Sequence, residues 1–138
     1  DDGRAWTVRD IGRWAGIGGM GPVFVGSGET VADRLQEWVA ETDWVEFLAE
    51  SPEIRSHTSV CLSVKNDRFR ALPKEKQSAF LKGIADILGK ENIAQDINSY
   101  KDAPPGFRFW CGPTVEPSDV RTALTALDKV YRERVYTL

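Results

Sequence analysis

The chain has 138 residues, of which 41% are hydrophobic and 28% are charged, and its formal net charge is −3. These values are ordinary for a globular protein of one domain, and the length suffices for a substantial hydrophobic core. The sequence shows no basic stripe of the kind that binds nucleic acid and no apolar run of membrane-spanning length, so we expect neither partner.

The first fifty residues are predicted to form an N-terminal helical segment (1–50) of a single domain (1–138). A short helix is expected at 8–14, followed by a glycine-rich segment, 16–29, which lacks the spacing of a phosphate-binding loop. From Thr30 onward, apolar residues recur on one face of a helix, namely Val31, Leu35, Trp38 and Val39. Residues 43–48 continue this segment, which should end near Pro52 because the residue before a proline disfavours helix.

Residues 51–138 are predicted to form a core of strand, helix, strand, strand and helix. The first strand is 57–65, where β-branched residues are frequent and apolar residues alternate. A helix opens at Pro73 and stops near Gly89, with an apolar stripe of Phe80, Ile84, Ile87 and Leu88.

Two further strands are predicted at 93–98 and 107–111, joined by a short connection that contains a Pro-Pro-Gly turn, so they should be antiparallel neighbours. The last helix begins at Pro117, with acidic residues in its first turn and basic residues near its end. The expected fold class is therefore α+β: a two-layer domain with a short, mostly antiparallel three-stranded sheet and helices packed on one face.

The chain contains two cysteines, Cys61 and Cys111, and one histidine, His57. The cysteines lack metal-ligand spacing and are expected to be buried free thiols. One histidine cannot build a histidine-rich site, so no metal site is predicted, and His57 is expected to lie where a strand begins.

The stretch "YKDAPPGFRFWCG" (100–112) sets an arginine inside an apolar strand. In a strand, Phe107 and Phe109 point one way while Arg108 and Trp110 point the other, so Arg108 can avoid the core. Two interpretations stay open on spacing alone. Arg108 is either an ordinary solvated side chain or a clamp that grips a carboxylate with two parallel hydrogen bonds. Lys101 could add a second positive charge nearby.

The blocks "IRSHTSVCLSVK" (54–65) and "AQDINSYKDAPPGFRFWCGPTVEPSDV" (94–120) resemble the C-terminal small domain of phosphoserine aminotransferases. "RWAGIGGM" (13–20) is similar to the start of that domain, whereas "GPVFVGSGE" departs from the alanine-rich helix expected there. The family is of fold type I, depends on pyridoxal phosphate, and is cytoplasmic and homodimeric. Its reaction converts glutamate and 3-phosphohydroxypyruvate into 2-oxoglutarate and phosphoserine in serine biosynthesis.

The resemblance implies that Arg108 grips the substrate α-carboxylate and that Lys101 lies near the substrate's phosphate or distal carboxylate. His57 replaces the family's usual asparagine, so no role transfers to it. The Schiff-base lysine is expected in the large domain, which this chain lacks, so no catalytic residue is assigned here. The chain alone is expected to be inactive and to bind no cofactor stably.

Two other functions remain open at this point. The chain could be a free-standing module that binds an amino acid or phospho-metabolite through Arg108 and Lys101. It could also be an interaction domain whose uncovered sheet face docks on a protein partner.

Overall fold

The computed structural model describes residues 28–112 and 114–138. The helix expected at 8–14 and the glycine-rich segment up to residue 27 lie outside these ranges. The elements in chain order are helix α2 (Gly28–Glu41), strand β1 (Val45–Phe47), the 3-10 turn η1 (Pro52–Ile54), strand β2 (Ser59–Val64), helices α3 (Asp67–Arg70) and α4 (Lys74–Lys90), strand β3 (Phe107–Trp110) and helix α5 (Pro117–Val135).

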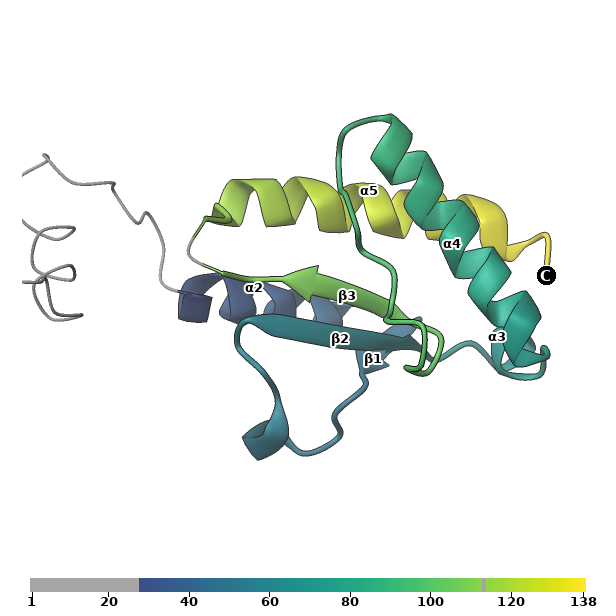
Figure 1. Ribbon diagram of the computed structural model, residues 1–138, viewed down its shortest axis with the longest axis horizontal. Coiled ribbons are helices and arrows are strands. Elements are labelled where there is room, and N and C mark those ends of the chain that lie inside the picture. The colour runs from purple at the N-terminus through teal and green to yellow at the C-terminus, as the bar shows by residue number, and fades with distance from the viewer. Residues whose placement is uncertain (1–27, 113) are drawn as a thin grey trace, which may run out of the picture.

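The three described strands form one antiparallel sheet in the order β1-β2-β3. Helices α2, α4 and α5 pack together against the sheet, as Figure 1 shows. Burial alternates along β2 and β3, so one face of the sheet meets the helices. No helix of residues 28–112 and 114–138 covers the other face, which we call the open face. The predicted two-layer α+β class is confirmed.

Aromatic side chains join the two layers near the centre of the core. The rings of Trp44 and Tyr131 stack with their centroids 3.6 Å apart and an interplanar angle of 11°. The Trp44 ring also meets Phe107 of β3 edge-on, and its indole N–H donates a 2.7 Å hydrogen bond to Asp128 of α5. Burial raises the pKa of the Tyr131 hydroxyl to about 12, so this ring stays neutral in the core.

Residues 43–48, which were expected to continue the helical segment that begins at Thr30, instead contain strand β1, and that expectation is wrong. Helix α2 ends at Glu41, where the hydroxyl of Thr42 donates to the carbonyl of Trp38. Val45 then pairs with Val64 of β2, and both side chains are buried. The helical spacing was present in the sequence, but pairing with β2 and the docking of Trp44 override it.

The strand expected at 93–98 is also absent from the described part of the chain. The structure shows a single bridge there, between Asn98 and Phe107, and irregular backbone before it. Asn92 and Asp96 have φ values of 55° and 52°, which extended strands do not use. The segment does run antiparallel to β3 over its last residues, so the predicted neighbours are adjacent but barely paired.

Gly106 is required by the close approach of its backbone to β2. A Cβ at this position would lie 2.2 Å from the carbonyl oxygen of Leu62, an atom that β2 holds in place. We predict that Gly106→Ala lowers the free energy of unfolding by about 2–4 kcal/mol, because β3 must shift away from β2. Urea denaturation followed by circular dichroism measures the loss.

Gly83→Ala is the matched control for this prediction. Gly83 lies inside α4, and the nearest atom to an added Cβ is 3.5 Å away at the end of the Arg134 side chain. Alanine should therefore stabilise the helix by about 0.5–1 kcal/mol. Equal effects of the two substitutions would contradict the close-approach argument.

Candidate functional site

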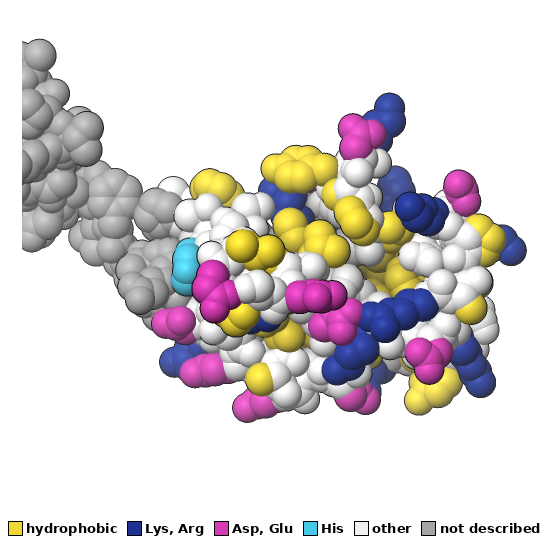
Figure 2. Space-filling view, turned by 90° about the horizontal axis from the view of Figure 1, so that it is seen from below, with side chains coloured by type: hydrophobic (Ala, Val, Ile, Leu, Met, Phe, Trp, Pro, Cys, Tyr) yellow, Lys and Arg dark blue, Asp and Glu magenta, His cyan; other side chains and the backbone are white. Residues whose placement is uncertain are grey.

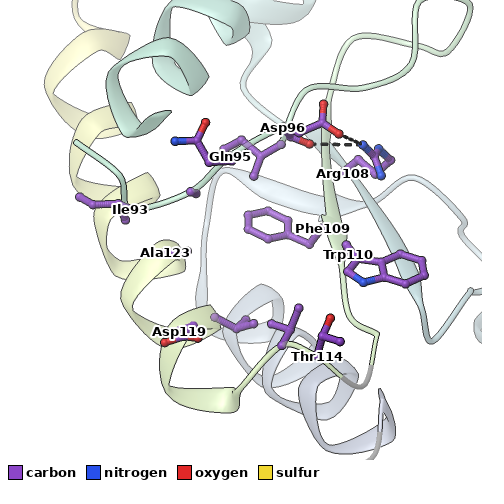
Figure 3. A pocket seen from close by; sticks show the side chains of 13 residues that line it. Ile93, Gln95, Asp96, Arg108, Phe109, Trp110, Thr114, Asp119 and Ala123 are labelled. Atoms are coloured by element: carbon purple, nitrogen blue, oxygen red, sulfur yellow. Dashed lines mark hydrogen bonds and ion pairs between the residues drawn. The ribbon is translucent and has the colours of Figure 1, made fainter. Parts of the chain in front are cut away.

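Side chains alternate in direction along β3, so the candidate site and the core lie on opposite faces of this strand. Phe107 and Phe109 are buried under the helices, while Arg108 and Trp110 lie on the open face. Figure 3 shows Phe109 pointing to one side of the strand and Arg108 and Trp110 to the other. The structure therefore confirms that Arg108 avoids the core.

Arg108 is nevertheless not an ordinary solvated side chain, because its side chain is only 11% exposed. Its Nη2 donates to the Asp96 carboxylate at 2.7 Å and to the Asp96 backbone carbonyl at 3.3 Å. The guanidinium carbon lies 4.5 Å from the centre of the Tyr100 ring, a cation–π geometry. These contacts hold the guanidinium in one orientation on the open face.

A backbone hydrogen bond also joins the segment that carries Asp96 to the strand that carries Arg108. The Arg108 N–H donates to the carbonyl of Ile97 at 2.8 Å, which fixes the 93–98 segment beside β3. The left-handed φ of Asp96 then turns its carboxylate toward Arg108. The Nε of Arg108 is buried and has no hydrogen-bond partner among the described residues, so part of its donor capacity is unused.

A hollow of about 500 Å³ lies next to Arg108, between β3, the 93–97 segment and the start of α5. Its lining is mainly apolar and includes the polar residues Asp96, Arg108 and Asp119. In Figure 3 the side chain of Arg108 points to the side of β3 away from Phe109 and Asp119. The indole of Trp110 borders it and folds over Gly112, where a Cβ would lie 2.5 Å from the ring.

Lys101 is exposed and lines a different hollow, of about 540 Å³, together with Tyr100 and residues of α4. No hydrogen bond or ion pair of Lys101 is found within residues 28–112 and 114–138. Tyr100 thus lies between the two predicted site residues: its ring contacts Arg108, and its neighbour in sequence is Lys101. The structure joins Arg108 to Asp96 and Tyr100 rather than to Lys101.

The two cysteines differ in environment, which corrects the expectation that both are buried. Both are free thiols, but only Cys111 is buried, and burial raises its pKa to about 11. Cys61 is half-buried and lies directly opposite Arg108 in the β2–β3 register, on the open face. His57 is exposed just before β2.

The charged side chains do not suggest a metal or an imine-forming centre. In the described ranges, no group of three or more histidine, cysteine and acidic side chains could hold a metal ion. All lysines of the chain lie in these ranges, and all are exposed. An imine-forming lysine needs a site shielded from water, so the lysines present do not fit pyridoxal phosphate as a covalent cofactor.

Figure 2 shows acidic, basic and apolar side chains interspersed over the face that it presents, without a field of one sign. None of the described helices combines the length and the apolar character needed to cross a bilayer.

Fold and site together define a small α+β domain that presents a shielded arginine on an open sheet face, suited to binding an anion. Comparison with known proteins shows which sequences this domain resembles. Over 120 residues, or 86% of its length, the chain is 40% identical to a phosphoserine aminotransferase of Methanosarcina barkeri. It is 38% identical to that of Methanosarcina mazei over the same share. The chain is therefore a homologue of the C-terminal part of phosphoserine aminotransferases, as its motifs predicted.

The chain spans about 30% of the length of these relatives, a share that fits a small domain. A dimethyl-sulfide monooxygenase of Hyphomicrobium sulfonivorans is 51% identical over 72 residues, but this match covers 40% of the chain and 15% of that protein, too little to assign a family. No family model matches the chain.

Sequence reasoning missed Asp96 and Tyr100 as neighbours of Arg108. Asp96 falls within the strand predicted at 93–98, which does not form, and Tyr100 falls in the connection that follows it. The spacing of these residues carries no recognisable period, because the 92–106 segment is irregular. The one available signal was an acidic residue within a segment predicted to lie beside the arginine strand.

Cys61 offers a chemical probe of the open face. We predict that iodoacetamide at pH 8 alkylates Cys61 in the folded chain much faster than Cys111, because the Cys111 thiol is buried and its pKa is about 11. Peptide mass spectrometry after timed quenching measures the two rates. In denaturant the rates should become similar, and faster alkylation of Cys111 in the folded chain would contradict the assigned burial.

Proposed function

We propose that this chain is the substrate-binding C-terminal part of a phosphoserine aminotransferase. The parent enzyme would transfer an amino group from glutamate to 3-phosphohydroxypyruvate, giving 2-oxoglutarate and phosphoserine. The observation that carries the proposal is the orientation of Arg108, a shielded guanidinium on the open sheet face beside a hollow. The names of the relatives support the reaction class.

In this proposal Arg108 binds the α-carboxylate of the substrate. A planar guanidinium donates two parallel hydrogen bonds to a carboxylate, and the charge assistance is stronger where water is partly excluded. Stacking on Tyr100 limits the rotation of the guanidinium, so little side-chain entropy remains to be lost when the ligand binds.

Lys101 supplies the second positive charge, for the phosphate or the distal carboxylate. Its exposed ammonium is suited to a phosphate as a mobile point charge rather than as a fixed fork. Because Lys101 lines the hollow on the other side of Tyr100, the substrate would extend past that ring.

The remaining parts of the enzyme lie outside this chain in our proposal. Pyridoxal phosphate supplies the electron sink for amino transfer in the parent enzyme, and the large domain provides its lysine. We further propose that the parent enzyme is cytoplasmic and homodimeric and that the chain alone is inactive. The exposure of every lysine supports the last point.

The substrate-binding proposal predicts that substitutions of Arg108 and Lys101 change the affinities for serine and phosphoserine in different ways. We expect serine and phosphoserine to perturb amide signals around Arg108 in two-dimensional NMR titrations of the chain. Arg108→Ala should weaken both ligands about tenfold or more, since it removes charge-assisted hydrogen bonds. Lys101→Ala should weaken phosphoserine about two- to fivefold and leave serine unchanged.

The control variant is Lys90→Ala, which removes an equal charge from the end of α4. If Arg108→Ala left the affinities for serine and phosphoserine unchanged, the proposed clamp would be excluded. A chain that binds neither ligand would leave the interaction-domain alternative, to be tested by pull-down.

A separate prediction concerns the cofactor. When the chain is mixed with pyridoxal phosphate and reduced with borohydride, labelling should be scattered and substoichiometric, because no lysine is shielded from water. Peptide mapping locates the modified lysines, and the full-length Methanosarcina barkeri enzyme serves as the positive control. Stoichiometric labelling of one lysine in the chain would overturn the proposed inactivity.

A further inference from the structure

We infer that the carboxylate of Asp96 is the resident occupant of the Arg108 clamp, so that a ligand carboxylate binds by taking its place. The inference rests on the proposed function, in which Arg108 binds a carboxylate. It adds a residue that sets the affinity of the site: Asp96 acts as an internal competitor and not only as a support for the guanidinium.

The geometry of the guanidinium requires this competition. A guanidinium can grip a carboxylate along two edges, Nε–Nη2 or Nη1–Nη2, and both include Nη2. In Arg108, Nη2 donates to the Asp96 carboxylate at 2.7 Å and to the Asp96 carbonyl at 3.3 Å. Nη2 therefore already serves two acceptors of Asp96, and a two-pronged ligand competes with them for its N–H groups.

The carboxylate, rather than the carbonyl, is the acceptor that can leave. The carbonyl belongs to backbone that the hydrogen bond from the Arg108 N–H to the Ile97 carbonyl holds against β3. The Asp96 side chain is 84% exposed, so its carboxylate can rotate into water without losing solvation. Displacement thus needs one side-chain rotation and no movement of the strand.

The burial of Arg108 explains why an internal partner is present at all. Its side chain is 11% exposed, and its Nε has no described partner. An unpaired charge in such a position is unfavourable, and a nearby carboxylate compensates for it. The same pairing must reduce the affinity for a ligand carboxylate, because the ligand gains only the difference between the two interactions.

Asp96→Asn tests the inference with little disturbance of the backbone. The φ of Asp96 is 52°, and asparagine tolerates this left-handed conformation as aspartate does. The amide oxygen still accepts a hydrogen bond from Nη2, but the negative charge is gone. We expect phosphoserine and serine to bind about three- to fivefold more tightly to Asp96→Asn than to the unsubstituted chain.

The matched control is Asp86→Asn, which removes the same charge from an exposed ion pair with Lys82 on α4. It should leave both affinities unchanged, so a general change in net charge is separated from the local effect. Affinities are measured by NMR titration, with the Arg108 Nε–H signal as the local probe and Arg108→Ala as the variant that abolishes binding.

A second measurement uses the unsubstituted chain and does not depend on the folding of the variant. The ¹³C chemical shift of the Asp96 carboxyl carbon should move toward that of a solvated aspartate as phosphoserine saturates the chain. A shift that stays constant, or an affinity that is equal or lower in Asp96→Asn while Arg108→Ala still abolishes binding, overturns the inference alone. Binding that does not depend on Arg108, or no binding to any variant, contradicts both this inference and the proposed function.

Discussion

The period of two along β3 is the constraint on which this domain depends. It commits Phe107 and Phe109 to the core and sends Arg108 and Trp110 to the open face. A shift of one residue would point the guanidinium into the apolar core and place two phenylalanines on the open face, so the register is strongly specified. The absence of a side chain at Gly106 maintains that register, since β3 could not otherwise approach β2 closely where it begins.

The site built on this strand is a balance between a shielded cation and a movable anion. Arg108 is oriented by Tyr100 and by the backbone near Ile97, while the Asp96 carboxylate compensates for its charge. The two partners differ widely in exposure, which makes the arginine the fixed member and the aspartate the movable one. Such asymmetry suits a site that must remain stable when empty and still exchange its partner for a ligand.

The homology to phosphoserine aminotransferases relates the Arg108–Asp96 pair to a part of a larger protein. The chain corresponds to a minor part of those proteins, and its lysines are all on the surface. In the function that we propose, substrate recognition and covalent chemistry come from different parts of the parent enzyme. Within this chain, the two-layer core supports β3 and thereby holds Arg108 in a fixed position on the open face.

The sequence by itself determined most of the core and the direction of Arg108. The apolar periods of β2, α4 and α5 are unbroken, and local alternation is sufficient to place an arginine outside a core. Only the tertiary structure decided that residues 45–47 form a strand, because helical spacing there competes with pairing to β2 and with the docking of Trp44. It also decided that Asp96 faces Arg108. That contact depends on a left-handed backbone in an irregular segment, and neither propensity nor spacing encodes such a conformation.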